Sequence, residues 1–148
     1  GVLSDTSGAI SNTFEFTEKQ VKDIVVPFDR LVSFEAPVTP EQVEKAVAQH
    51  GFSRYPLFSD GELQGYLHIK DVLDLDDDEY RSPFPAKRVR TLMNLATHTE
   101  LEDALALMRR GGQHLATAVD ADGLDVGIIF LEDILEELVG EVQDATRR

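Results

Sequence analysis

The stretch GIIFLEDILEEL, residues 127–138, joins an apolar, strand-like segment to an acidic, amphipathic one. Almost the same pattern occurs earlier as GYLHIKDVLDL, residues 65–75. In each stretch a glycine precedes an aspartate by six residues. Gly65 and Gly127 are 62 residues apart, and so are Asp71 and Asp133. The chain therefore contains one strand-to-helix junction twice, which indicates an internal repeat.

The segments around the two junctions repeat as well. Residues 39–51 predict a helix that begins at the N-cap Thr39, has Pro40 in its first turn and ends at Gly51. Residues 55–69 predict two strands around a Ser-Asp-Gly turn. After the junction, the charged and proline-broken segment 76–88 is the best candidate for a linker. Two apolar segments, 21–28 and 30–34, are expected to be extended.

The same order follows the linker. Residues 99–112 predict a helix with Thr99 as its cap and Glu102 completing a capping box. Residues 114–131 predict two strands around an Asp-Gly turn, and 132–142 predict the closing helix. His114 lies 60 residues after Arg54, and we assign the difference from 62 to the hairpin turn.

We therefore predict an α+β fold of two β–α–β–β–α repeats packed with pseudo-twofold symmetry. A short N-terminal helix carries Ile10 and Phe14 on one face. The predicted boundaries are 1–20 for this helical lead-in, 21–83 for the first repeat and 84–144 for the second. Each repeat alone buries little surface, so the two are expected to share a core, with clefts between them where ligands bind.

Composition excludes several classes of function. The 148 residues hold 14 Lys and Arg against 28 Asp and Glu, a net charge of −14, so we expect neither nucleic-acid binding nor direct membrane contact. There is no cysteine, which rules out disulfides and thiolate metal sites, and no apolar run approaches the ~20 residues that span a bilayer. Because the chain begins with Gly1, we expect it to be a piece of a longer protein.

Two readings of the junction stay open at this point. Alternation along 63–69 places Tyr66 and His68 opposite Leu67, and Ile128 and Phe130 lie likewise opposite Ile129. The aspartate three residues on falls in the first turn of a helix, where its carboxylate can accept hydrogen bonds from a ligand such as a ribose diol. Alternatively it only stabilises the helix dipole and caps free N–H groups. A structural cap would be repeated just as a binding residue would.

The motifs VKDIVVP (21–27), SRYP (53–56), LHIKD (67–71) and LEDILEELVGE (131–141) together resemble a tandem pair of CBS domains, also called a Bateman module. More narrowly, they resemble the pair of the CorC/HlyC or CNNM-like magnesium and cobalt efflux proteins, which are hemolysin-like. The resemblance covers roughly residues 10–142. It implies a regulatory module that binds ATP or AMP, with Mg²⁺ when the ligand is ATP. It also implies a homodimer, a membrane transport domain in the full-length chain and a cytoplasmic location.

The resemblance also implies the site residues. Asp133 matches the ribose-binding aspartate, Arg54 matches a residue that family members use on the phosphates, and the segment 25–27 matches the strand beside the adenine. The implied nucleotide site comprises Val25, Val26, Pro27, Arg54, Tyr55, Pro56, Ile128, Phe130 and Asp133, and a second site comprises His68, Asp71 and His114.

This chain departs from the family pattern at two positions of that site. Phe130 stands where relatives have Ser or Thr, and Val26 stands where a polar residue is usual. Both changes remove hydrogen bonding. The ring of Phe130 either stacks on a base or blocks the pocket. The alternative function is therefore a ligand-free structural module that holds two transporter subunits together.

We predict neither a metal site nor an enzyme. An EF-hand loop starting at Asp74 would need Gly and Glu where Glu79 and Pro85 stand, and the four histidines show no metal-ligand spacing. No nucleophile and base can be paired from the sequence. The basic run 87–90 is too short to predict a nucleic-acid surface. On the last helix, Ile134, Leu135, Leu138 and Val139 form an apolar stripe that fits core packing or a dimer contact.

Overall fold

The computed structural model describes residues 18–146, and the side chains of residues 18–140. The chain forms two compact units: unit 1 combines the segments up to Arg30 and from Met93 onward, and unit 2 is Leu31–Leu92. Residues 21–30 thus belong to the same compact unit as the second repeat, and residues 84–92 to the same unit as the first. Each unit is described by itself.

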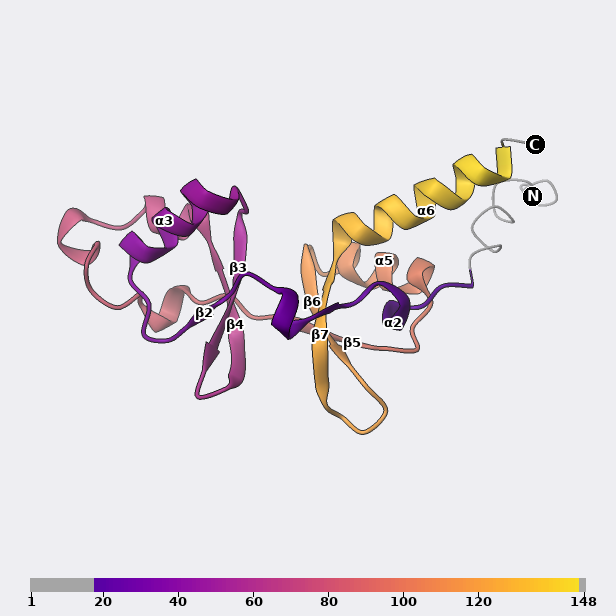
Figure 1. Ribbon diagram of the computed structural model, residues 1–148, viewed down its shortest axis with the longest axis horizontal. Coiled ribbons are helices and arrows are strands. Elements are labelled where there is room, and N and C mark those ends of the chain that lie inside the picture. Colours follow the sequence, from indigo (N-terminus) through magenta and orange to yellow (C-terminus); the bar gives the residue numbers. More distant parts are fainter. Residues whose placement is uncertain (1–17, 147–148) are drawn as a thin grey trace. The chain divides into compact units, whose positions relative to one another are not determined.

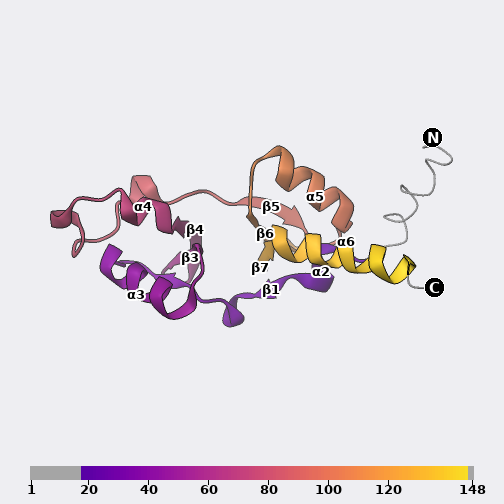
Figure 2. The same cartoon turned by 90° about the horizontal axis from the view of Figure 1, so that it is seen from above.

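Unit 2 contains one full repeat. Its order is β2 (Phe34–Glu35), α3 (Pro40–His50), β3 (Arg54–Ser59), β4 (Glu62–His68) and α4 (Ile69–Leu73), followed by the 3₁₀ turns η2 (Asp77–Glu79) and η3 (Ala86–Arg88). The sheet order is β2-β3-β4, with β2 parallel and β4 antiparallel to β3. The predicted β–α–β–β–α order is confirmed here (Figure 1, and Figure 2 for α4).

Local chemistry explains where these elements begin and end. The Thr39 hydroxyl accepts a hydrogen bond from the Gln42 N–H at 3.2 Å, and the Gln42 side chain accepts the Thr39 N–H at 2.9 Å, which is the predicted start of α3. Gly51 ends the helix in the left-handed conformation at φ 75°. Asp60 and Gly61 have φ 51° and 79°, so the hairpin turns through two positive-φ residues, as a type I′ turn requires.

The core of unit 2 includes part of the predicted linker. Buried side chains from both helices and the sheet form one cluster: Val38, Val43, Leu57, Leu67, Val72 and Phe84. The backbone N–H of Phe84 donates to the Val38 carbonyl oxygen at 2.7 Å. The segment 76–88 is therefore part of unit 2 and not a free linker, because the buried ring of Phe84 holds it to the core.

Unit 1 contains the second repeat together with a strand from the N-terminal segment. Its elements are α2 (Val21–Ile24), β1 (Val26–Pro27), η1 (Phe28–Arg30), β5 (Met93–Ala96), α5 (Leu101–Arg110), β6 (Leu115–Val119), β7 (Asp125–Phe130) and α6 (Leu131–Thr146). The sheet order is β1-β7-β6-β5. Side chains of α2, α5 and α6 form a buried cluster with one sheet face, and these helices lie on the same side of the sheet (Figure 1, Figure 2).

Two local predictions in unit 1 were wrong. Residues 21–24 are a helical turn rather than an extended segment, because Gln20 and Asp23 form a reciprocal capping box. Helix α5 has Glu100 as its N-cap rather than Thr99, and no side chain caps it. The backbone of Thr99 is already engaged, since its N–H donates to Ala96 and its carbonyl oxygen accepts from Val21.

The apolar stripe of α6 divides between core and surface. Ile134 and Leu138 are buried in the core, whereas Leu135 and Val139 are exposed. The predicted N-terminal helix with Ile10 and Phe14 lies outside the described residues. Among the helices that the structure describes, none has the length and apolar character needed to cross a bilayer.

Candidate functional site

The two junctions have the same backbone plan. Helix α4 starts at Ile69 after the N-cap His68, and α6 starts at Leu131 directly after Phe130, so Asp71 and Asp133 each occupy the third helical position. Leu67 and Ile129 belong to the two cores, as the predicted alternation requires. The sequence repeat therefore corresponds to a repeat in structure.

The repeated glycine has a packing cause. In unit 2, the backbone of Arg90 pairs with that of Tyr66 through two hydrogen bonds of 2.9 Å, and a Cβ on Gly65 would lie 2.2 Å from the Arg90 carbonyl oxygen. In unit 1, β1 pairs with β7, and a Cβ on Gly127 would lie 2.3 Å from the Val26 carbonyl oxygen. Each glycine allows another segment to cross close to the last strand of its sheet.

The hydrogen-bonding side chains of the first junction, His68 and Asp71, both have partners within unit 2. The ring Nδ1 of His68 accepts the Lys70 N–H at 3.0 Å and caps α4. Asp71 accepts two hydrogen bonds from Arg90, from Nε at 2.8 Å and from Nη2 at 3.0 Å. The Asp71 side chain is only 13% exposed. The hydrogen bond from Arg90 lowers the pKa of Asp71, so this carboxylate is ionised and paired.

Positive charge gathers at this junction. Burial lowers the pKa of His68, and the charges of Arg54 and Arg90 lower it further. Arg54 stands opposite His68 in the β3–β4 ladder, and its Nε is buried without a hydrogen bond. His68 is therefore neutral at pH 7, in keeping with its role as a hydrogen-bond acceptor at the helix start.

The second junction lacks such hydrogen bonds among the described residues. Phe130 has no side-chain acceptor to cap α6, and Asp133 forms no hydrogen bond or ion pair with any residue that the structure describes. Burial raises the pKa of Asp133, and the nearby charges of Glu136 and Glu132 raise it further. This carboxyl group is half-buried beside like charges with no compensating partner within its unit.

Unit 1 brings together most of the predicted nucleotide site. Val26 pairs with Ile128 and Pro27 with Gly127, so the segment predicted to lie beside an adenine runs along β7. Val25 is the C-cap of α2, and its Cγ2 would lie 2.8 Å from a Cβ placed on Gly127. Phe130 and Asp133 follow at the end of β7 and the start of α6.

The other predicted nucleotide ligands belong to unit 2. Arg54, Tyr55 and Pro56 are consecutive residues of β3. Tyr55 is fully buried, and its ring lies 5.4 Å from that of Phe34 between centroids. The Tyr55 hydroxyl has no hydrogen bond of ordinary geometry. Burial raises the pKa of Tyr55, and the Phe52 backbone lowers it by less. Burial makes Tyr55 and Pro56 core residues of this strand.

His114 does not correspond to Arg54. In the two ladders Arg54 pairs with His68 and Leu115 pairs with Phe130, so Leu115 is the counterpart of Arg54. The carbonyl oxygens of Ser53 and His114 each accept the N–H of the residue that starts the following helix, which makes these two residues equivalent. His114 is exposed and belongs to unit 1, whereas His68 and Asp71 belong to unit 2.

Sequence reasoning missed Arg90. It appeared only in the short basic run 87–90, yet it binds Asp71, the repeated aspartate of the first junction. The sequence held a signal, because Val89 and Arg90 lie 64 residues after Val25 and Val26, close to the 62-residue period of the junctions. The structure shows the correspondence: Arg90 pairs with Tyr66 as Val26 pairs with Ile128.

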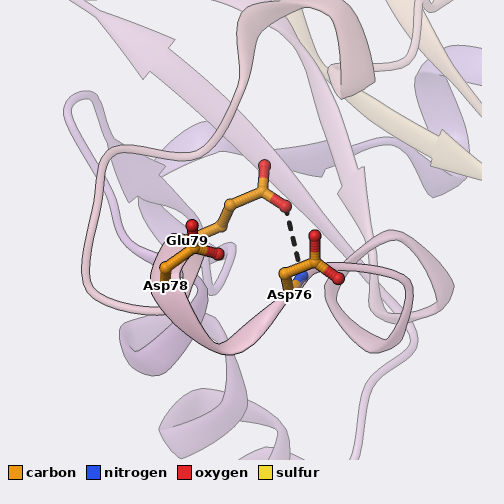
Figure 3. Close-up of side chains that lie close together, drawn as sticks. All are labelled: Asp76, Asp78 and Glu79. Atoms are coloured by element: carbon orange, nitrogen blue, oxygen red, sulfur yellow. Dashed lines mark hydrogen bonds between the residues drawn. The ribbon is translucent and has the colours of Figure 1, made fainter.

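One acidic group could hold a cation by geometry alone. Asp76, Asp78 and Glu79 each offer a carboxylate oxygen within 4.8 Å of the others (Figure 3). Glu79 accepts the Asp76 N–H at 3.1 Å, so it acts as the cap of a 3₁₀ turn. The group lies on the surface of unit 2, and a local cap accounts for its arrangement.

Known proteins resemble this chain in both sequence and structure. The family model of the CBS domain matches residues 21–78. An uncharacterized protein of Mycobacterium tuberculosis is 36% identical over 145 residues, which is 94% of this chain and 42% of that protein. Hemolysin C of Rickettsia prowazekii is 29% identical over 143 residues, 95% of this chain and 47% of that protein. The chain thus spans less than half the length of these relatives.

Solved structures agree. The CBS domain of the bacterial CNNM/CorC family Mg²⁺ transporter superposes with a TM-score of 0.78 and 27% identity, covering 88% of this chain and 81% of that one. Residues 21–78 are thus similar to a CBS domain, and the chain has the CBS-pair fold of the CNNM/CorC domains. A CNNM/CorC CBS domain in complex with ATP has the same fold, with a TM-score of 0.77 and 24% identity over 95% of this chain and 99% of that one.

Proposed function

We propose that this CBS-domain pair is a regulatory module that binds an adenine nucleotide at its second junction. The observation that carries the proposal is the state of Asp133, a half-buried carboxyl group with no partner among the described residues. A buried polar group without a partner costs free energy, and a ligand that supplies hydroxyl donors relieves that cost. The ATP complex of a CNNM/CorC CBS domain supports the class of ligand.

The residues around Asp133 fit the parts of a nucleoside. The carboxylate accepts hydrogen bonds from the two ribose hydroxyls. The apolar segment Val25–Pro27 and Ile128 flank the base through their pairing across β1 and β7. The Phe130 ring replaces a hydrogen-bonding side chain with a stacking surface, and stacking of a base on an aromatic ring contributes about 1–3 kcal/mol.

The phosphates require positive charge, which this acidic chain holds in few places. Arg54 is our proposed phosphate ligand, on the strength of the family resemblance, because a guanidinium offers a fork of donors to phosphate oxygens. With a net charge of −14 the chain repels a free nucleotide. We therefore propose that ATP binds together with Mg²⁺, which neutralises part of its charge, whereas AMP needs no cation.

The proposed regulation acts by population shift. A ligand that binds one arrangement of the module better than another moves the equilibrium by the difference in affinity. We propose that the module lies on the cytoplasmic side of a CorC-type Mg²⁺ and Co²⁺ efflux membrane protein, forms a homodimer and passes its ligand state to the transport domain. The module itself performs no catalysis.

A second candidate function is a ligand-free structural module of the same transporter, acting through its dimer interface. Two observations favour it. Val26 and Phe130 both place apolar groups where a nucleotide would need polar ones. Asp133 would then stay half-buried without a partner.

Calorimetric titration with ATP and Mg²⁺ separates these functions. The unmodified chain should bind, while Asp133→Asn should weaken binding at least about tenfold, since two charge-assisted hydrogen bonds become weaker neutral ones. Arg54→Ala should weaken ATP more than AMP. Lys45→Ala, an exposed change on α3, is the control and should leave affinity unchanged. Unchanged affinity in Asp133→Asn would exclude the proposed site.

A further inference from the structure

The ion pair between Asp71 and Arg90 occupies the atoms that a ligand would use at the first junction. Arg90 holds both carboxylate oxygens of Asp71, at 2.8 and 3.0 Å, in a bidentate arrangement. The Asp71 side chain is 13% exposed, and the second acceptor of the junction, His68 Nδ1, is engaged by the Lys70 N–H. Neither group is available to a ribose.

The position of Arg90 is set by the backbone rather than by the ion pair. Its N–H and carbonyl oxygen both bond to Tyr66, each at 2.9 Å. The crossing is close, because a Cβ on Gly65 would lie 2.2 Å from the Arg90 carbonyl oxygen. The guanidinium therefore starts from a fixed point beside Asp71, which reduces the conformational entropy lost when an exposed ion pair forms.

The second junction shows what happens without this arginine. Val26 crosses β7 opposite Ile128 just as Arg90 crosses β4 opposite Tyr66, and both crossings require a glycine on the neighbouring strand. Valine brings no charge, and Asp133 stays unpaired among the described residues. The residue in the crossing segment thus decides whether the aspartate of each junction is paired or unpaired.

We propose that Arg90 closes the first junction by acting as an internal substitute for ligand, so that each chain binds nucleotide at the second junction alone. The inference rests on the proposed function of Asp133 for its count of one nucleotide per chain. It assigns Arg90 as the residue that determines this stoichiometry. A ligand could enter the first junction only by displacing two charge-assisted hydrogen bonds at once.

The test is the binding stoichiometry of the intact chain, measured by calorimetric titration with ATP and Mg²⁺ and, separately, with AMP. The unmodified chain should bind one nucleotide. Arg90→Ala should bind two, since it frees Asp71 while keeping the backbone pairing with Tyr66. Adding Asp71→Asn to Arg90→Ala should return the count to one. Arg90→Gln serves as a second variant in case the alanine chain fails to fold by circular dichroism.

Arg88→Ala is the matched control. Arg88 lies two residues away, carries the same charge and pairs with Asp74 at 3.8 Å, so its removal should leave one nucleotide per chain. A folded Arg90→Ala and a folded Arg90→Gln that still bind one nucleotide would overturn the inference. If the unmodified chain binds none and Arg90→Ala binds one, the closure by Arg90 stands and the proposed site at Asp133 fails.

Discussion

Asp71 and Asp133 stand at the same position of two repeats, and their surroundings shift the pKa values of the two carboxyl groups in opposite directions. The hydrogen bonds from Arg90 lower the pKa of Asp71, whereas burial beside Glu136 and Glu132 raises the pKa of Asp133. The pairing of Asp71 originates outside the repeated motif, in a residue that crosses the strand from a neighbouring segment, whereas the like charges beside Asp133 belong to α6 itself. Similar local sequence patterns can therefore carry different chemistry.

This contrast predicts opposite effects of the same substitution on stability. Asp71→Asn should lower the melting temperature at pH 7, because it leaves Arg90 without its carboxylate. Asp133→Asn should raise the melting temperature of the ligand-free chain, because it removes a desolvated charge beside like charges. Differential scanning calorimetry of the two variants against the unmodified chain measures both, and each variant is the matched control of the other.

The pH dependence follows from the direction of each shift. The lowered pKa of Asp71 means that its stabilisation is present above its unfolded pKa near 3.8 and is lost as pH falls through the folded value. The raised pKa of Asp133 means that the folded chain binds its proton more tightly. The destabilisation by Asp133 should therefore fade as pH falls through the folded pKa. A gain from Asp133→Asn that grows on acidification would contradict this assignment.

At the scale of elements, the helices and hairpins could be predicted because their signals are local. Thr39 with Gln42, Gly51 and the Asp60–Gly61 turn each act within a few residues, and all lie where the sequence placed them. Two features depended on distant partners and could not be predicted: the burial of Phe84 in the core of unit 2 and the N-cap of α5 at Glu100. The helical turn at 21–24 was not predicted either, although its capping contact joins Gln20 and Asp23.

The candidate site shows the same division. The positions of Asp71 and Asp133 in the first turn of a helix follow from the sequence period. The ion pair of Asp71 with Arg90 joins residues 19 apart and depends on how a segment crosses β4, which no local pattern encodes. The equivalence of Arg54 with Leu115 rather than His114 likewise required the strand register.

The close crossings predict which glycines tolerate a side chain. Gly127→Ala and Gly65→Ala should each lower the free energy of unfolding by about 1–3 kcal/mol or more, because the new Cβ meets a backbone oxygen that cannot move freely. Gly140→Ala is the control: nothing lies within 4 Å of its Cβ position in α6. It should raise stability by about 0.5–1 kcal/mol. Urea unfolding measures all three, and a harmless Gly127→Ala would show that β1 does not cross as described.

At the scale of the whole molecule, the chain is strongly acidic, yet positive side chains gather in one place. The chain carries −14 overall, yet its first junction gathers Arg54, Arg90 and Lys70 around His68. Long-range repulsion between this chain and free nucleotide is screened within about 8–10 Å at physiological salt. Under the proposed function, affinity would therefore depend on short-range contacts with base and ribose and on a cation bound to the phosphates.

The most direct test of nucleotide sensing is thermal unfolding of the unmodified chain with ATP, ADP and AMP, each with and without Mg²⁺. A ligand at about 100 times its Kd stabilises the folded state by ~2.7 kcal/mol. For a chain of this size that should raise the melting temperature by about 5–10 °C. We expect this rise with ATP only when Mg²⁺ is present, and with AMP in either condition. If no nucleotide at millimolar concentration raises the melting temperature, the proposal of nucleotide sensing is contradicted, and the ligand-free structural module remains as the proposed function.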